Sequence, residues 1–273
     1  MSESTVWEQQ RGRIRTRKGG WHIGEGVKAG NYSLLEQLLH ENTPNDVLFL
    51  HVHGYLPDPA ISRFIDGVVT CMSYPDARIW CNQIAALAGT SGCHPIVGIG
   101  AALMASDSSL YGPGTTEASC AFIAEGRAAL AAGQSAADFL AERRRQRRPQ
   151  TPGYARPIAQ GDDRVAEIRT LAARLGLTEG EHVRAGDAIG AAIGGSDGSA
   201  MNFMGIVSAF WLDLGLLPRN GELLFSMCIG AGAAACFEEA DQAPRGTFLP
   251  LRCDDIEYTG VAPREWPNQG EPG

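Results

Sequence analysis

The chain has 273 residues, of which 44% are hydrophobic and 20% are charged, and its formal net charge is −8. This composition is typical of a globular protein with a sizeable core and argues against disorder. Because acidic residues outnumber basic ones, it also argues against generic nucleic-acid binding, which needs a basic surface. The N-terminus has no apolar signal segment, and no apolar run reaches the roughly 20 residues of a membrane helix. We therefore expect a cytoplasmic protein that binds neither nucleic acid nor a membrane.

Neither the cysteines nor the histidines form a metal-binding pattern. The seven cysteines are scattered without CxxC spacing, so free thiols are expected. His51 and His53 form an HxH pair, but no third ligand follows at a suitable spacing. We expect no metal site.

The first half of the chain shows helical periodicity. Residues 31–39 (NYSLLEQLL) predict a helix with Ser33 as its cap, and DPAISRFIDGVVTCMS predicts a second helix that starts near Pro59. The nearly uncharged stretch 77–106 predicts two buried helices broken by turn residues near 92–95. Residues 107–116 then predict a loop, followed by a helix over 117–130.

The second half begins with the basic run AADFLAERRRQRRPQ, where the composition changes near Gln146. A segment rich in glycine and proline, TPGYARPIAQGDDR, leads into a charged helix, DRVAEIRTLAARLGL. After the loop GGSDGS, MNFMGIVSAFWLDLGLLP predicts a long apolar helix, and ELLFSMCIGAGAAACFEEA predicts another. The tail from Pro244 is expected to be extended.

Evidence for strands is thin, because only LFLHVHGYL has a strand-like composition and its neighbours have helical periodicity. The sequence therefore predicts an all-α fold with a large and a smaller helical domain. We expect residues 1–145 to form the first part of the large domain and 146–235 the smaller domain. Residues 236–273 are expected to return to the large domain and end in the tail.

Several segments, in this order, resemble motifs of the citrate synthase superfamily, particularly its short citryl-CoA lyase-like members. SLYGPGTTEA is similar to the family's LHGGANEA loop, and GYARPIAQGDDR is similar to its GYGHPVY…GDPR signature. MNFMGIVSAFWLDLG resembles LNVDGAIAAVLLDLG, and IEYTGVAPREWP resembles the family's tail. The resemblance implies an all-α fold, a homodimer, and a coenzyme A (CoA) thioester and a carboxylate as substrates.

The central catalytic positions depart from the family. Matching the motifs places Tyr111 and Arg156 where the family has two histidines, and Met204 where it has the aspartate that removes a proton. Tyrosine can donate a hydrogen bond to an oxyanion, and arginine can hold a carboxylate, but methionine cannot act as a base. Asp107 and Asp197 are candidates for a replacement base.

The resemblance also suggests binding residues. Arg164, together with Arg156, Asn202 and Met204, would contact the substrate. The residues expected to bind CoA lie in the basic run (Arg147 and Arg148) and in the signature segment (Gly153 and Tyr154). Simpler interpretations remain open: the arginine run is solvated, Arg164 is exposed and Met204 fills the core. Tyr111 would then pack on its loop neighbours, and Asp107 and Asp197 would be ordinary surface aspartates.

Two functional hypotheses follow. The first is an enzyme that forms or cleaves a carbon–carbon bond beside a thioester carbonyl, or that transfers or hydrolyses the acyl group, in a reworked site. The second is a non-catalytic pseudoenzyme that serves as a sensor or as a partner subunit. The Ala/Gly-rich stretch 85–102 is a candidate for the dimer interface that the resemblance implies.

Overall fold

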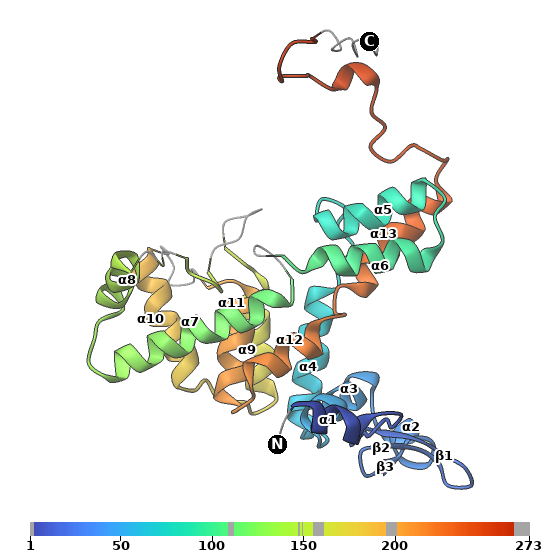
Figure 1. Ribbon diagram of the computed structural model, residues 1–273. Helices are drawn as coiled ribbons and strands as arrows, with labels where there is room; N and C mark the ends of the chain where they lie inside the picture. The colour runs from blue at the N-terminus through green and yellow to red at the C-terminus, as the bar shows by residue number, and fades with distance from the viewer. Residues whose placement is uncertain are drawn as a thin grey trace, which may run out of the picture.

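The computed structural model describes residues 3–108, 112–146, 148, 150–154, 161–194 and 201–264. Within these ranges the fold is mainly helical, which confirms the predicted class. Helices α5, α6 and α13 lie together at one end, helices α7 to α12 gather at the other, and α4 stands between them (Figure 1). A short sheet and helix α1 (Glu3–Gln10) extend from the N-terminal part.

The N-terminal part differs from the prediction because it contains strands. Strands β1 (Gly19–His22), β2 (Gly26–Ala29) and β3 (Tyr32–Ser33) form an antiparallel sheet in that order. The predicted helix over 31–39 starts only after β3, as a π-helical turn (Leu34–Leu38) that continues into α2 (Leu39–Glu41). Ser33 is its cap as expected, since its Oγ accepts a hydrogen bond from the Glu36 amide at 3.2 Å.

The strand-like LFLHVHGYL sequence forms part of helix α3 (Pro44–His53). A capping box between Thr43 and Asp46 begins this helix, and Gly54 ends it in the left-handed conformation with φ +88°. Helix α4 (Pro59–Met72) follows as predicted, with Phe64, Ile65 and Val68 buried on one face.

Three helices pack closely through small residues at one end of the molecule. They are α5 (Trp80–Thr90), α6 (Pro95–Ser106) and α13 (Gly230–Gln242). A Cβ atom at Gly89 would lie 2.4 Å from the Phe237 carbonyl oxygen, and one at Gly98 would lie 2.6 Å from the Phe237 ring. The two predicted helices and the break between them are confirmed, but α6 is not buried as predicted, because Ile96, Val97 and Met104 are exposed. Glycine is needed where α13 crosses the two helices.

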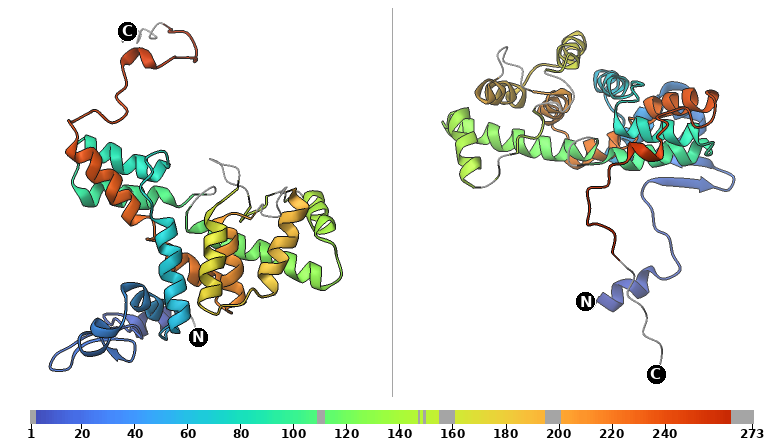
Figure 2. Two further views of the ribbon diagram at one scale, coloured as in Figure 1. Left: turned by 180° about the vertical axis from the view of Figure 1, so that it is seen from behind. Right: turned by 90° about the horizontal axis from the view of Figure 1, so that it is seen from above.

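The other group of helices surrounds α11 (Phe203–Asp213), whose residues 203–211 are all buried. Trp211, which is fully buried, packs against Phe225 with ring centroids 5.5 Å apart. Figure 2 shows the long α7 running along one side of this group. The surrounding helices are α7 (Gly114–Ala131), α8 (Ala136–Arg145), α9 (Arg164–Arg174), α10 (Glu181–Ile193) and α12 (Pro218–Phe225).

The prediction of one helix over ELLFSMCIGAGAAACFEEA was wrong, because a turn over 226–229 separates α12 from α13. Contacts with the residues just after α4 accompany the break. The Ser73 hydroxyl donates to the Cys228 carbonyl, and a Cβ at Gly232 would lie 2.6 Å from the backbone carbonyl oxygen of Tyr74. The span Pro218–Gln242 is apolar and long enough to cross a membrane by composition alone, yet half of its most apolar window is buried inside the protein. This burial is typical of core helices.

The chain after α13 is fastened to the end of α5 before it leaves the body. Arg245 Nη1 donates to the Gly89 carbonyl at 2.7 Å, and the Phe248 amide donates to the Thr90 hydroxyl at 3.3 Å. Beyond this point the tail is extended, as predicted, apart from a 3-10 turn (Cys253–Asp255). The predicted domain division at 145/146 stays a prediction; α7 and α8 before it pack against α10 after it.

Candidate active site

The segment around Gly153 and the start of α11 meet at backbone distance, and we call this contact the junction. The backbone N–H of Asn202 donates to the Gly153 carbonyl at 2.9 Å, and Tyr154 forms an isolated antiparallel bridge with Met201. A Cβ at Gly205 would lie only 2.1 Å from the Gly153 oxygen, and Gly153 has φ +86°. Both positions require glycine, so two of the motifs are joined through their backbones.

Asp162 fastens the end of the signature segment to the same helix. Its side chain is 1% exposed, and its Oδ2 accepts a hydrogen bond from the Phe203 amide at 2.9 Å. It also accepts from Arg164 Nε at 2.8 Å and Nη2 at 2.7 Å. The Arg164 guanidinium lies 4.5 Å from the Phe203 ring centroid. Arg164 is thus held in a fixed orientation, with 23% of its side chain exposed.

The loop between α6 and α7 reaches the junction from the other side. Gly112 has φ +98°, and a Cβ there would clash with the Ser106 carbonyl oxygen at 1.8 Å. The first turn of α7 then brings the buried Thr116 to Met204, with its Oγ1 3.2 Å from the sulfur. The three motif segments therefore lie around the start of α11.

Tyr154 is buried at the junction, and its hydroxyl donates to the Gly186 carbonyl of α10 at 2.8 Å. Burial raises the pKa of this phenol above its usual range, and the nearby Asp187 raises it further. The ring also makes an edge contact with Phe122 on α7. Tyr154 thus ties the junction to α7 and α10, and its expected role in binding CoA stays a prediction.

A cluster of arginines lies at the end of α8. The guanidinium of Arg143 lies 4.7 Å from the Phe122 ring centroid and pairs with Glu125, and burial lowers its pKa. Glu125 also accepts from Arg148 Nη2 at 3.2 Å, while the Arg148 amide donates to the Arg143 carbonyl at 2.8 Å. Arg148 keeps 54% of its side chain exposed, so it can still reach a ligand.

The whole fold is similar to that of a citryl-CoA lyase. No protein-family model and no curated protein matches the sequence. The structure of citryl-CoA lyase from Hydrogenobacter thermophilus matches with a TM-score of 0.77 and 25% identity, over 93% of this chain and 97% of that chain. The chain belongs to the citrate synthase superfamily.

Two larger members of the superfamily share the fold at lower identity. An ATP citrate lyase from Methanosaeta concilii, solved with (3S)-citryl-CoA, matches with a TM-score of 0.73 and 16% identity, over 96% of this chain and 45% of that chain. Citrate synthase from Thermoplasma acidophilum, solved with carboxymethyl coenzyme A and oxaloacetate, matches with a TM-score of 0.64 and 16% identity, over 82% and 58% of the two chains.

Four of the predicted superfamily site residues, Tyr111, Arg156, Asp197 and Arg147, lie outside the described residues. Their flanks are described: Gly112 follows Tyr111, Tyr154 and Gly161 bracket the segment with Arg156, and Met201 follows the loop with Asp197. The structure brings these flanks together around the start of α11. The roles of the four side chains stay predictions.

Three other predicted residues are described and have partners of their own. Asp107 Oδ1 accepts from the Gly114 amide at 3.1 Å, at the start of α7. Asn202 caps α11, since its Oδ1 accepts from the Gly205 amide at 3.0 Å. Met204 is 9% exposed and belongs to the main core. Each therefore has a structural role, and their roles toward a substrate are untested.

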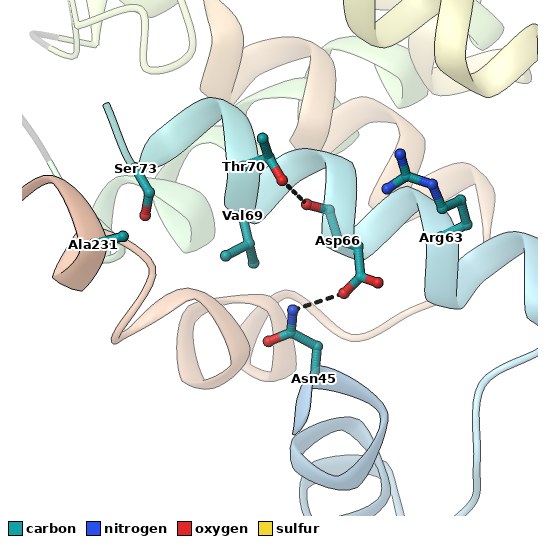
Figure 3. Close-up of a pocket in the computed structure, with 7 residues that line it drawn as sticks. All are labelled: Asn45, Arg63, Asp66, Val69, Thr70, Ser73 and Ala231. Carbon is teal, nitrogen blue, oxygen red and sulfur yellow. Dashed lines mark hydrogen bonds between the residues drawn. The ribbon is translucent and has the colours of Figure 1, made fainter. Parts of the chain in front are cut away.

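A hollow of about 510 Å³ lies away from these residues, between α3, α4 and the start of α13 (Figure 3). Arg63 and Asp66 line it, and Asn45 Nδ2 donates to Asp66 Oδ1 at 2.7 Å. It contains none of the predicted site residues. Among the described residues, no group of three or more His, Cys, Asp or Glu side chains is arranged to hold a metal ion.

The sequence motifs do not identify the supporting residues Asp162, Thr116, Glu125 and Arg143. The doubled acid in GDDR was a signal, because two adjacent carboxylates before a helix can serve different partners. The Phe203 amide that Asp162 binds lies 41 residues further along the chain. Only the folded structure reveals that pairing.

Proposed function

We propose that this protein acts on a CoA thioester together with a carboxylate substrate at the junction. The reaction class is formation or cleavage of the carbon–carbon bond next to the thioester carbonyl, or transfer or hydrolysis of the acyl group. One observation carries the proposal: three separate motif segments meet at the start of α11, in a fold shared along 97% of a citryl-CoA lyase chain. Two further matching structures were solved with (3S)-citryl-CoA and with carboxymethyl coenzyme A bound.

In this proposal, Arg164 and Arg156 hold the substrate carboxylate. Asp162 binds Nε and Nη2 of Arg164 and thereby sets the orientation of its guanidinium. Tyr111 donates a hydrogen bond to the thioester oxygen as it gains negative charge. Arg147 and Arg148 bind the phosphates of CoA, with Arg148 exchanging Glu125 for phosphate oxygens.

The buried Met204 changes how a proton can leave the α-carbon. It has no titratable group, and its sulfur contacts Thr116 inside the protein. General-base catalysis typically contributes about 10²–10⁴-fold, so the reaction needs another base or a route without one. Asp107 and Asp197 are the candidates, and Asp107 keeps one carboxylate oxygen beyond its bond to Gly114.

A pseudoenzyme is the alternative function. Two features favour it: Met204 is packed as a core residue, and Arg164 already has a carboxylate partner within its own chain. Such a protein would keep the fold and bind a ligand or a partner subunit without turnover.

We also propose a homodimer formed through the outer face of α5 and α6. Ala85 and Ala102 of the predicted interface stretch are buried within their own chain. Large apolar side chains instead point outward: Leu87, Ile96, Val97 and Met104 are 40%, 74%, 58% and 78% exposed. The three on α6 recur at helical spacing along one stripe, which favours a partner helix.

The test is isothermal titration of the full chain with CoA, acetyl-CoA and citrate, alone and combined, with Arg156→Ala, Arg164→Ala and Arg174→Ala variants. Arg174 is the matched control, because it lies exposed at the end of the same helix as Arg164. We expect CoA-thioester binding that citrate strengthens and that the first two substitutions weaken about tenfold or more, since each removes a charge-assisted hydrogen bond.

Turnover of acetyl-CoA or citryl-CoA, followed by thiol release, then separates the two functions. Binding with turnover supports the enzyme, and binding without turnover supports the pseudoenzyme. If no CoA compound binds, the proposed function fails.

A further inference from the structure

A second hollow, of about 320 Å³, lies far along the chain from the junction segments, and we call it the basic hollow. Three segments line it: the chain before β1, the turn between β2 and β3, and the last turn of α3. Arg17 and Lys18 come from the first segment, Asn31 from the second, and His51 and His53 from the third. No acidic side chain is among the described residues that line it.

This absence of acids is unusual in a chain with a net charge of −8. Arginines elsewhere in the described chain form ion pairs with carboxylates, as Arg127 does with Glu181 and Arg169 does with Glu179. Arg17 has no ion pair or hydrogen bond with any described residue, and neither do the side chains of Asn31 and His51. Three sets of donors therefore face one hollow without a protein partner.

Lys18 has a structural explanation that does not extend to its neighbours. Its ammonium donates to the His51 carbonyl at the end of α3, where a cation offsets the partial negative charge of the helix terminus. The Gly54 amide satisfies the Leu50 carbonyl at 2.8 Å, so the helix end already has its capping bonds. Arg17 is not needed for that purpose.

His53 marks the inner wall of the basic hollow. Its ring stacks on Phe49 with centroids 3.9 Å apart, its Nδ1 lies 3.2 Å from Asn220 Nδ2, and its Nε2 is buried without a partner among the described residues. The contacts with Phe49 and Asn220 hold the imidazole ring in one orientation. The wall formed by His53 therefore adds no carboxylate to the hollow.

We propose that the basic hollow binds a small oxyanion with two or more negative charges, of the kind presented by a phosphoryl group or a compact polycarboxylate. The Arg17 guanidinium supplies paired donors that match two oxygens, and the His51 ring and the Asn31 amide supply single donors from the other two segments. Lys18 adds positive charge at the rim. This site is separate from the junction and does not rest on the function proposed there.

The experiment uses the full chain labelled with ¹⁵N-histidine and follows its six histidine side chains by NMR. Inorganic phosphate is titrated in one arm and citrate in the other, both at constant ionic strength. The His51 signal, assigned with His51→Gln, reports this hollow rather than the junction. We expect a saturable shift of that signal, and in Arg17→Gln a dissociation constant raised about tenfold, because one bidentate charged contact is lost.

The controls separate binding from folding. Arg63→Gln, at the other hollow, should bind as the wild type does. Arg17 and Asn31 are exposed, so Arg17→Gln and a second variant, Asn31→Ala, should unfold at the wild-type urea concentration. Saturation by phosphate alone, by citrate alone or by both supports the site and identifies its ligand class. The absence of a saturable shift in both arms, or equal affinity in Arg17→Gln, would overturn it.

Discussion

The junction and the outer face of α5 and α6 differ in how closely their residues are packed within the chain. At the junction, Gly205 allows the backbone of Gly153 to approach so closely that no side chain fits between them. On α6, a Cβ at Gly100 would meet nothing within 4 Å, and the apolar side chains of Val97 and Met104 are exposed. The first region is completed by its own chain, and the second needs a partner. A substitution at the junction should therefore change folding, whereas one on the outer face should change assembly.

The largest expected effect is on the proposed dimer. Val97→Glu would place a charge on each side of the interface, and burying unpaired charges costs several kcal/mol. We expect the dimer dissociation constant to rise by roughly a thousandfold, about 4 kcal/mol, in sedimentation experiments. Val6→Glu, on the exposed side of α1, is the matched control. Equal dissociation constants for both variants would remove this face from the interface.

At the junction, Gly205→Ala should destabilise the fold itself. The new Cβ would lie 2.1 Å from a backbone oxygen that cannot rotate away. We expect the free energy of unfolding to fall by about 3 kcal/mol in urea titrations, near the upper end for overpacking. Gly230→Ala, where a Cβ meets nothing within 4 Å, should be neutral or slightly stabilising. A wild-type midpoint for Gly205→Ala would contradict the close approach.

Asp162→Asn tests the contacts by which Asp162 joins Arg164 to the start of α11. The amide keeps an acceptor for Phe203 but loses the charge that pairs with Arg164. Because Arg164 is partly exposed, we expect a loss of about 2 kcal/mol, less than for a fully buried pair. A double-mutant cycle with Arg164→Met should give a coupling energy of about 1 kcal/mol or more, and additive losses would argue against the pair.

The smallest effect concerns pH and His53. Burial lowers the pKa of this imidazole, and nearby Lys18 lowers it further, so the unfolded chain takes up the proton first. The stability contributed by neutral His53 is complete above the unfolded value of about 6.5 and is lost as pH falls toward the folded pKa. Wild-type protein should therefore lose more stability on acidification than His53→Phe. Parallel losses would show that other groups dominate.

The sequence predicted those elements whose cause is local. The buried face of α4 follows from the spacing of Phe64, Ile65 and Val68, and the cap at Ser33 follows from its own hydroxyl. The short strands were missed because glycine-rich segments of two to four residues carry little alternation. The break between α12 and α13 was missed because its contacts, at Ser73 and Tyr74, come from the end of α4.

The candidate site divides in the same way. The motifs placed the predicted site residues in three separate segments, and the structure brings the described flanks of these segments together at Gly153 and Met204. The sequence did not predict which side chains hold them there, because Asp162 meets Phe203, and Glu125 meets Arg148, across long stretches of chain. Such pairings depend on the tertiary packing.

The fastening of residues 245–248 to the end of α5 also sets a boundary for limited proteolysis. Arg252, the first arginine after it, is exposed in the extended tail, so trypsin should cut there while the backbone bonds to Thr90 remain intact. Cleavage at Arg252 alone would keep every helix from α1 to α13. A tag or fluorophore attached beyond Phe248 would therefore report on the tail without disturbing the helical body.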